Sequence, residues 1–348
     1  FAGLQTTGTV GIYHNGIGAT VYADNFTYSA DDYNPVTYTT IPISNSSISL
    51  SPYNWYDATT YQQANSGGAY IKVAFSGTTL GLNIDDSQIG STTTSGYEMR
   101  AYIDGSTTPI EKTFADIDIR DILVFTDELS AGNHYAIVYM QPPVSNVDRW
   151  AGNPVTAIMV EGIVLEENEN ILSLEGTPLE EAAQRLIFYG DSITEGANST
   201  YYEDGYAPKL ARLLGTEYGR AGYNGLRWTT DHPTTFITAL YSGDASIDSW
   251  ANHSSSKSRL TGGTYTDGAP DGIFNALGIN DALNSFSTST MRTRVTGYIE
   301  AVRTASSVDT HIYMIVPFNY GNGYATYKTA FLGGVSDYLT ANPSDTKV

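Results

Sequence analysis

The sequence contains no cysteine, few basic residues and no long hydrophobic run. The absence of cysteine excludes disulfides, thiolate metal sites and a cysteine nucleophile. Only 17 lysines and arginines stand against 37 aspartates and glutamates, so a surface for nucleic-acid phosphates is not expected. No stretch approaches the roughly 18 uninterrupted apolar residues that span a membrane. The formal net charge of −20 instead suits a neutral or weakly charged substrate.

The chain is long enough for two domains and has the composition of an extracellular protein. Its 348 residues exceed a typical single domain, and 41% of them are hydrophobic, enough for a buried core. Ser, Thr, Asn, Gly and 27 tyrosines are abundant, whereas lysine is scarce. The chain begins at Phe1 rather than at methionine. We therefore expect a secreted protein whose signal peptide has been removed. Sequons for glycosylation begin at Asn25, Asn45, Asn198 and Asn252.

Up to about residue 165, hydrophobic residues recur at every second position in short segments. Ile71, Val73 and Phe75 are one example. This period, interrupted by Gly, Asn, Asp and Pro, is typical of antiparallel strands with one buried face. Many such strands in so short a stretch predict a sandwich or jelly roll. The predicted strands are residues 71–75, 80–84, 97–103, 135–139 and 158–165.

The pattern changes across residues 166–184, which are acidic and lack a period. We place the domain boundary there, which gives domains of residues 1–170 and 171–348. Beyond the boundary, compact hydrophobic runs alternate with segments of helical period, and this predicts a parallel sheet with helices on both faces. The expected fold class is α/β, a jelly-roll-like β-sandwich followed by an α/β/α domain. The second domain has predicted strands at 186–188, 216–221, 272–278 and 311–318, and predicted helices at 207–214, 291–302 and 327–339.

Polar clusters follow two predicted strands of the second domain, and a glycine-rich loop follows a third. The first strand ends in "GDS" (190–192) and a later one in "GIND" (278–281), with "GRAGYNGLRW" (219–228) between them. The carboxyl ends of parallel strands share one edge of a sheet, where ligands gather. Ser192 is therefore a candidate nucleophile for an acyl carbon. Its own N–H, a glycine N–H of the second loop and the Asn280 amide are candidate donors to an oxyanion.

These three blocks resemble those of the SGNH hydrolases, also called the GDSL esterase family. "GDSI" matches the block that carries the nucleophile, here Ser192. Gly222-x-x-Gly225 matches the block whose second glycine supplies an oxyanion N–H. "GIND" (278–281) matches the block whose asparagine, here Asn280, supplies a third donor. The resemblance covers the second domain and implies an α/β/α fold that needs no metal or organic cofactor.

The first half is similar to the β-sandwich of two-domain carbohydrate esterases. The similarity lies in "VAFSGTTLGLNI", "AYIDG", "GNHYAIVYM" and "VEGIVLEE". In those proteins a jelly roll precedes an SGNH domain, and the enzyme removes acetyl groups from plant polysaccharides. The resemblance implies a serine esterase that forms an acyl-enzyme and acts on an acetylated polysaccharide or oligosaccharide. It also makes the sandwich a candidate carbohydrate-binding domain, and it says nothing of the oligomeric state.

Each candidate residue has a structural alternative. Ser192 follows Gly-Asp at a strand end, where serine is also a favoured helix cap. We expect Asp191 to form a turn through hydrogen bonds to nearby backbone, and Asp281 to buttress its loop. Trp228 and Trp250 are candidates for stacking on sugar rings or, alternatively, core aromatics. The glycines that support the tight turns are Gly190, Gly222 and Gly278.

The base that would activate Ser192 is absent from its expected place. In the SGNH family a histidine follows a fifth strand in a motif like Asp-x-x-His, and this sequence has no such motif. Because Lys347 and Val348 match the start of such a strand, we expect the histidine to lie in a further segment of about 30–60 residues. His232 beside Asp231 is the candidate base within the sequence, although it precedes the third block, contrary to the family order.

The other four histidines are not expected to serve Ser192. His14 and His134 belong to the first half, and His134 follows Gly-Asn as a turn residue would. We expect His253, in "NHSSSKS", to lie in a mobile polar loop, and His311 to begin a strand. The missing base leaves open a second function, a catalytically inactive carbohydrate-binding or structural protein on the same scaffold. Acyl transfer to another sugar is a third possibility, which differs only in what intercepts the acyl-enzyme.

Overall fold

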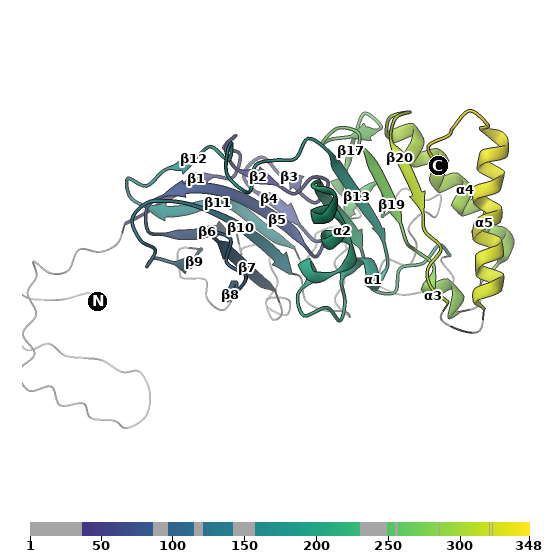
Figure 1. Ribbon diagram of the computed structural model, residues 1–348, viewed down its shortest axis with the longest axis horizontal. Coiled ribbons are helices and arrows are strands. Elements are labelled where there is room, and N and C mark those ends of the chain that lie inside the picture. The colour runs from purple at the N-terminus through teal and green to yellow at the C-terminus, as the bar shows by residue number, and fades with distance from the viewer. Residues whose placement is uncertain are drawn as a thin grey trace, which may run out of the picture.

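A computed structural model of the protein describes residues 37–85, 97–114, 121–141, 157–229, 249–254, 257–284, 286–319, 321 and 323–348. Antiparallel sheets form the first part of the chain, and a parallel sheet with helices forms the second (Figure 1). The two parts lie side by side along the long axis of the molecule. This architecture confirms the predicted fold class. None of the described helices is long and apolar enough to cross a membrane.

The first part is a sandwich of two antiparallel sheets. All five predicted strands are present, as β5, β6, β7, β10 and β11. One sheet has the order β3 (Tyr56–Asp57), β4 (Gln62–Ala64), β11 (Ile158–Glu166), β6 (Leu80–Ile84) and β9 (Ile122–Thr126), with β1 (Tyr38–Pro42) also paired to β11. The other has the order β12 (Ile171–Leu172), β5 (Ala69–Ser76), β10 (Asn133–Gln141), β7 (Glu98–Ile103) and β8 (Ile110–Thr113), with β2 (Ser49–Leu50) also paired to β5.

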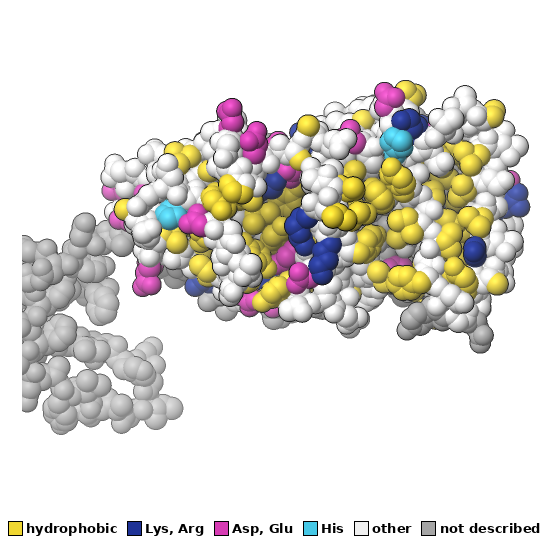
Figure 2. Space-filling model, in the orientation of Figure 1, with side chains coloured by type: hydrophobic (Ala, Val, Ile, Leu, Met, Phe, Trp, Pro, Cys, Tyr) yellow, Lys and Arg dark blue, Asp and Glu magenta, His cyan; other side chains and the backbone are white. Residues whose placement is uncertain are grey.

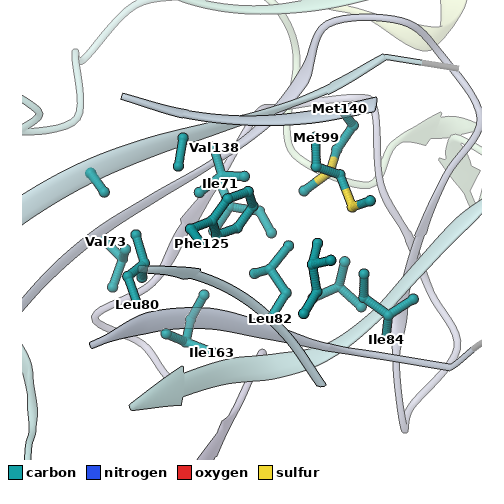
Figure 3. Packing of buried hydrophobic residues seen from close by; sticks show 14 of the residues in the cluster. Ile71, Val73, Leu80, Leu82, Ile84, Met99, Phe125, Val138, Met140 and Ile163 are labelled. Atoms are coloured by element: carbon teal, nitrogen blue, oxygen red, sulfur yellow. The ribbon is translucent and has the colours of Figure 1, made fainter. Parts of the chain in front are cut away.

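Hydrophobic side chains from both sheets fill the interior of the sandwich (Figure 3). Ile71 and Val73 of β5 face Leu80 and Leu82 of β6, and all four are fully buried. The period of two places such residues on the inner face of each strand. Strand β5 is buried along nearly its whole length, because its other face is covered by the second part of the chain.

The second part contains a four-stranded parallel sheet among its described residues. Its order is β14 (Glu217–Gly222), β13 (Arg185–Gly190), β19 (Gly272–Asn275) and β20 (His311–Met314). Alternate residues of β13 serve two cores: Ile187 packs with helices α4 (Thr288–Ala305) and α5 (Tyr324–Ala341), and Phe188 packs with α2 (Tyr206–Leu214). This explains why β13 is a continuous hydrophobic run rather than an alternating one.

Some predicted elements differ in length from those in the structure. The strands expected at 272–278 and 311–318 end earlier, at Asn275 and Met314, because the residues that follow form the loops of the sheet edge. Strand β12 pairs with β5, so the sandwich sheet continues to Leu172, just past the predicted boundary.

Two small hairpins were not predicted. They comprise β15 (Asn252–Ser254), β16 (Lys257–Ser258), β17 (Leu260–Thr261) and β18 (Thr264–Tyr265).

Buried polar groups join the sandwich to the second part of the chain, and we call this contact the seam. The Arg220 guanidinium is fully buried and donates to the Gly67 carbonyl of the sandwich and to the Tyr202 carbonyl, the latter at 2.9 Å. Arg100 of β7 forms a salt bridge with Glu203, Nε to Oε1 at 2.9 Å. Because such bonds are directional, they fix the position of one part against the other.

Candidate active site

The loop after β13 presents Ser192 at the carboxyl edge of the parallel sheet. It leads into a short helix, α1 (Ser192–Glu195). Asp191 caps this helix, since its Oδ1 accepts a hydrogen bond from the Ile193 N–H at 3.0 Å. Ser192 is half-buried, and its hydroxyl makes no hydrogen bond to another described residue. The capping role therefore falls on Asp191 and leaves the Ser192 hydroxyl available.

The glycine loop after β14 lies directly against α1. The Tyr223 N–H donates to the Gly190 carbonyl at 3.2 Å, which extends the pairing of β13 and β14 into the two loops. A Cβ on Gly222 would lie 2.4 Å from the Glu195 backbone nitrogen, so this position requires glycine. Gly225 has a φ of +78°, in the left-handed region that favours glycine, and open space lies around it.

The third loop begins at Gly278 and contains the short helix α3 (Ile279–Ala282). A Cβ on Gly278 would collide with the Tyr327 ring, so this glycine too is required by packing. The side-chain amide of Asn280 donates to the Leu226 carbonyl at 3.0 Å, and this bond ties the third loop to the glycine loop. An amide has two N–H donors, and the second one makes no other hydrogen bond to the described residues, so it can act on a bound group.

Asp281 supports the glycine loop rather than its own. Its carboxylate accepts hydrogen bonds from the Trp228 N–H at 3.0 Å and from the Thr229 hydroxyl at 3.0 Å. Burial raises the pKa of Asp281 to about 7, against the opposing effect of these hydrogen bonds. Burial likewise raises the pKa of Asp191 to about 6, although the Ile193 and Gly278 N–H groups lower it. Two buried carboxyl groups of the candidate site therefore titrate near neutral pH.

The three loops thus meet at one edge of the sheet, as the strand order predicts. Ser192, the glycine loop with Gly225, and Asn280 belong to adjacent segments that are joined by hydrogen bonds. A serine hydroxyl that shares this edge with backbone and amide N–H donors is suited to attack an ester carbonyl, and the donors are suited to hold the oxyanion that forms.

None of the three described histidines hydrogen-bonds to Ser192. His134 lies in β10, not in a turn, and its Nδ1 contacts Asp104 Oδ2 at 2.6 Å. His253 is only 4% exposed and lies in β15, so the prediction of a mobile loop was wrong; its carbonyl accepts a hydrogen bond from Asn65. His311 is the first residue of β20. It therefore lies at the amino ends of the parallel strands, whereas Ser192 follows a carboxyl end. His14 and His232 lie outside the described residues.

Trp228 and Trp250 are core residues and do not present their rings to a ligand. Trp228 is fully buried, its indole N–H donates to the Leu277 carbonyl at 3.2 Å, and its ring packs on Tyr298. Trp250 is 5% exposed and packs on the same tyrosine. Of the two predictions for these residues, core packing is correct.

Within the described part of the chain, no group of three or more His, Asp or Glu residues could hold a metal ion.

The second part of the chain matches a known protein family. Residues 188–340 match the GDSL-like Lipase/Acylhydrolase family. This part of the chain is similar to GDSL-like hydrolases. The match runs from β13 into α5 and includes the three loops described above. It confirms the predicted resemblance and the class that goes with it, carboxylic ester hydrolases.

Solved structures with the same two-part layout are similar over nearly the whole chain. A family two carbohydrate esterase from Cellvibrio japonicus has a TM-score of 0.66 and 14% identity, covering 87% of this chain and 86% of that one. A family two carbohydrate esterase from Clostridium thermocellum, in complex with cellohexaose, has a TM-score of 0.63, 17% identity and 86% coverage of both chains. An acetyl xylan esterase from the rumen bacterium Butyrivibrio proteoclasticus has a TM-score of 0.62 and 15% identity, covering 90% and 89%. At these identities the likeness concerns the fold. A search of curated proteins finds no match.

Proposed function

We propose that the protein is a serine esterase that removes acetyl groups from a polysaccharide or oligosaccharide. The observation that carries this proposal is the joining of the Ser192, Gly225 and Asn280 loops at one edge of the GDSL-like domain. The structural likeness to carbohydrate esterases supports the substrate class. The composition and the net charge of −20 are consistent with secretion and with an uncharged polymer as substrate.

The reaction would proceed through an acyl-enzyme. The Ser192 Oγ attacks the acetyl carbonyl carbon while a base takes its proton, and a tetrahedral oxyanion forms. The N–H groups of Ser192 and Gly225 and the free N–H of the Asn280 amide stabilise this oxyanion. The base returns the proton to the departing sugar oxygen, and the C–O bond breaks. Water then attacks the acetyl-serine and releases acetate, which restores the hydroxyl.

The base is expected to be a histidine, and it is not among the three described. His134, His253 and His311 make contacts elsewhere in the fold. His232 is the candidate within this sequence. If it is the base, His232→Ala will lower kcat by several orders of magnitude, as loss of a triad member does, whereas His253→Ala will not. Equal activity of His232→Ala and wild type would exclude His232.

The proposal is tested first by covalent labelling. The protein is treated with a fluorophosphonate and its intact mass is measured after deglycosylation. One adduct is expected on the wild type and on Ser199→Ala, the matched control, and none on Ser192→Ala. Asn280→Ala is expected to reduce kcat on an acetyl ester by about 10²–10³-fold, the cost of one oxyanion donor. Failure of the wild type to react would contradict the esterase.

A second candidate function is a carbohydrate-binding protein without catalysis. It is favoured by the lack of a hydrogen bond between Ser192 and any described histidine. This function predicts no fluorophosphonate adduct together with saturable binding of an oligosaccharide. The two candidates are therefore separated by the labelling experiment alone.

A further inference from the structure

A groove of about 370 Å³ lies on the seam, and none of the residues that line it belongs to the three loops. It is bounded by the outer face of β7 and β10, by α2, and by the 3-10 helix η3 (Tyr202–Asp204) with the residue before it. In Figure 2 the molecule is hollowed between the sandwich and α2, with hydrophobic side chains in the floor and charged ones at the rim. The residues that matter here are Tyr102, Tyr135, Tyr139, Tyr201, Asp204 and Arg212.

Tyrosines of the sandwich form the floor of the groove. Tyr135 and Tyr139 alternate with inward-facing residues along β10, so both point away from the sandwich core. Tyr102 belongs to the neighbouring strand, opposite Ile137, and packs edge-on against Tyr139 with ring centroids 5.9 Å apart. Tyrosine offers a broad apolar face and a polar tip in one side chain, which is the combination that a sugar ring requires.

The wall of the groove is held rigidly by the seam. The Arg100 guanidinium lies 4.5 Å from the centre of the Tyr201 ring and also binds the Glu203 carboxylate. The Tyr102 hydroxyl donates to the same carboxylate at 2.9 Å. These contacts fix the floor and the wall relative to each other before any ligand arrives. A site ordered in advance loses less conformational entropy on binding.

Two polar groups of the groove have no hydrogen-bond partner within the described residues. The Asp204 carboxylate and the Tyr135 hydroxyl make no hydrogen bond there, although Asp204 is only half-exposed. The groove carries no excess of positive charge, because Arg212 stands against Glu203 and Asp204 in its lining, and Arg100 behind the wall is shared by Glu203 and Glu98. The groove thus offers unpaired hydrogen-bonding groups beside aromatic rings. A ligand with many hydroxyl groups and no net charge fits this combination.

The groove also adjoins the segment that carries Ser192. A Cβ on Gly196, the residue that ends α1, would lie 3.0 Å from the Tyr202 carbonyl oxygen, so the groove wall packs on the end of α1. The Arg220 guanidinium binds the same carbonyl. The wall of the groove and the helix that carries the candidate nucleophile are therefore parts of one packed unit.

We propose that this groove binds the neutral backbone of an oligosaccharide chain and holds it beside the edge where Ser192 lies. The choice of a carbohydrate rests on the proposed function, but binding in the groove does not require catalysis. On an acetylated oligosaccharide, loss of the groove raises KM and leaves kcat unchanged. Hydrolysis of 4-nitrophenyl acetate, which has no sugar chain, is unaffected.

The test is calorimetric titration of Ser192→Ala with cellohexaose and xylohexaose. In that background Tyr201→Ala removes the wall ring, and Thr107→Trp fills the groove from its exposed rim. Each is expected to weaken binding of at least one of the two sugars by about tenfold or more. Tyr313→Ala is the matched control, because Tyr313 is 44% exposed on β20, outside the groove, and it is expected to bind as Ser192→Ala does.

Unchanged affinity in both groove variants would overturn the proposal, as would the absence of binding by Ser192→Ala. Tighter binding of an oligogalacturonate than of the neutral sugars would also overturn it, since a groove without excess positive charge is not expected to prefer an anionic chain. Melting temperatures equal to that of Ser192→Ala show that the variants are folded. Loss of fluorophosphonate labelling in the wild type contradicts the esterase instead, so the two failures are distinguishable.

Discussion

The interior of the sandwich and the seam are buried by different chemistry. The sandwich interior consists of hydrophobic side chains such as Leu82 and Phe125, which need only to be removed from water. The seam contains fully buried guanidinium groups, Arg100 and Arg220, whose donors must each be satisfied. Hydrophobic burial has no direction, whereas salt bridges and hydrogen bonds do. The sandwich core therefore supplies stability, and the seam determines how the two parts of the chain are placed.

The largest effect is expected where a buried charge loses its partner. Glu203→Gln leaves the fully buried Arg100 without the carboxylate that binds its Nε and Nη2, each at 2.9 Å. Breaking a buried pair costs about 3–5 kcal/mol of the free energy of unfolding, which urea denaturation measures.

Glu98→Gln is the matched control, because Glu98 binds the same guanidinium. Its side chain is 41% exposed, against 6% for Glu203. A loss below about 1 kcal/mol is expected there. Equal losses in the two variants would mean that burial of the pair is not what distinguishes the seam.

A somewhat smaller effect is expected in the sandwich interior. Leu82→Ala removes a fully buried side chain between the two sheets and leaves a cavity, at a cost of about 3 kcal/mol. Leu213→Ala, at an 83% exposed position of α2, should change the free energy of unfolding by less than about 0.5 kcal/mol. If Leu82→Ala were as mild as Leu213→Ala, the interior would not be close-packed.

The smallest effect is expected at His134 of the sandwich, as a dependence of the free energy of unfolding on pH. Burial would lower the pKa of His134, but its hydrogen bonds to Asp104 and to the Ser130 carbonyl raise that pKa above the ordinary value. Because the folded-state pKa is raised, the contribution to stability is fully present below about pH 6.5 and is lost as the pH rises through the folded pKa.

His134→Gln is therefore expected to destabilise the protein more at pH 5.5 than at pH 8.5. The difference should stay within about 1 kcal/mol, because Asp104 is 44% exposed and the pair is screened by solvent. Asp104→Asn should remove the same pH dependence in urea denaturation. A His134→Gln loss that is equal at both pH values would show that the imidazolium contributes nothing.

The hydrophobic pattern predicts much of the fold, because each pattern reports a local requirement. Alternation identifies β5, β6, β7, β10 and β11, since one face of each lies in the sandwich. Gly215 marks the end of α2, where its φ of +64° is left-handed. The hairpins of residues 252–265 could not be predicted, because two- and three-residue polar strands leave no measurable period.

The candidate site was predictable only in part. The "GDS" and "GIND" blocks and the glycine loop carry short motifs, so the meeting of these three loops at one edge of the sheet followed from the strand order. No short sequence motif marks the residues of the seam or of the groove. Arg100 and Glu203 are separated by 103 positions in the sequence, and nothing local marks either as the partner of the other. His253 was misjudged because its burial depends on Tyr56 and Asn65 of the sandwich.

The placement of Arg220 bears on how this protein can be engineered. Its guanidinium connects the Gly67 carbonyl in the sandwich to the Tyr202 carbonyl in the segment after α1. Truncating the chain to a minimal GDSL-like domain would delete one end of this connection and expose to water a guanidinium that is otherwise buried beside the segment after α1. The sandwich is therefore not a detachable module, and domain swaps between such proteins would have to carry the Arg220 contact surface along with the fold.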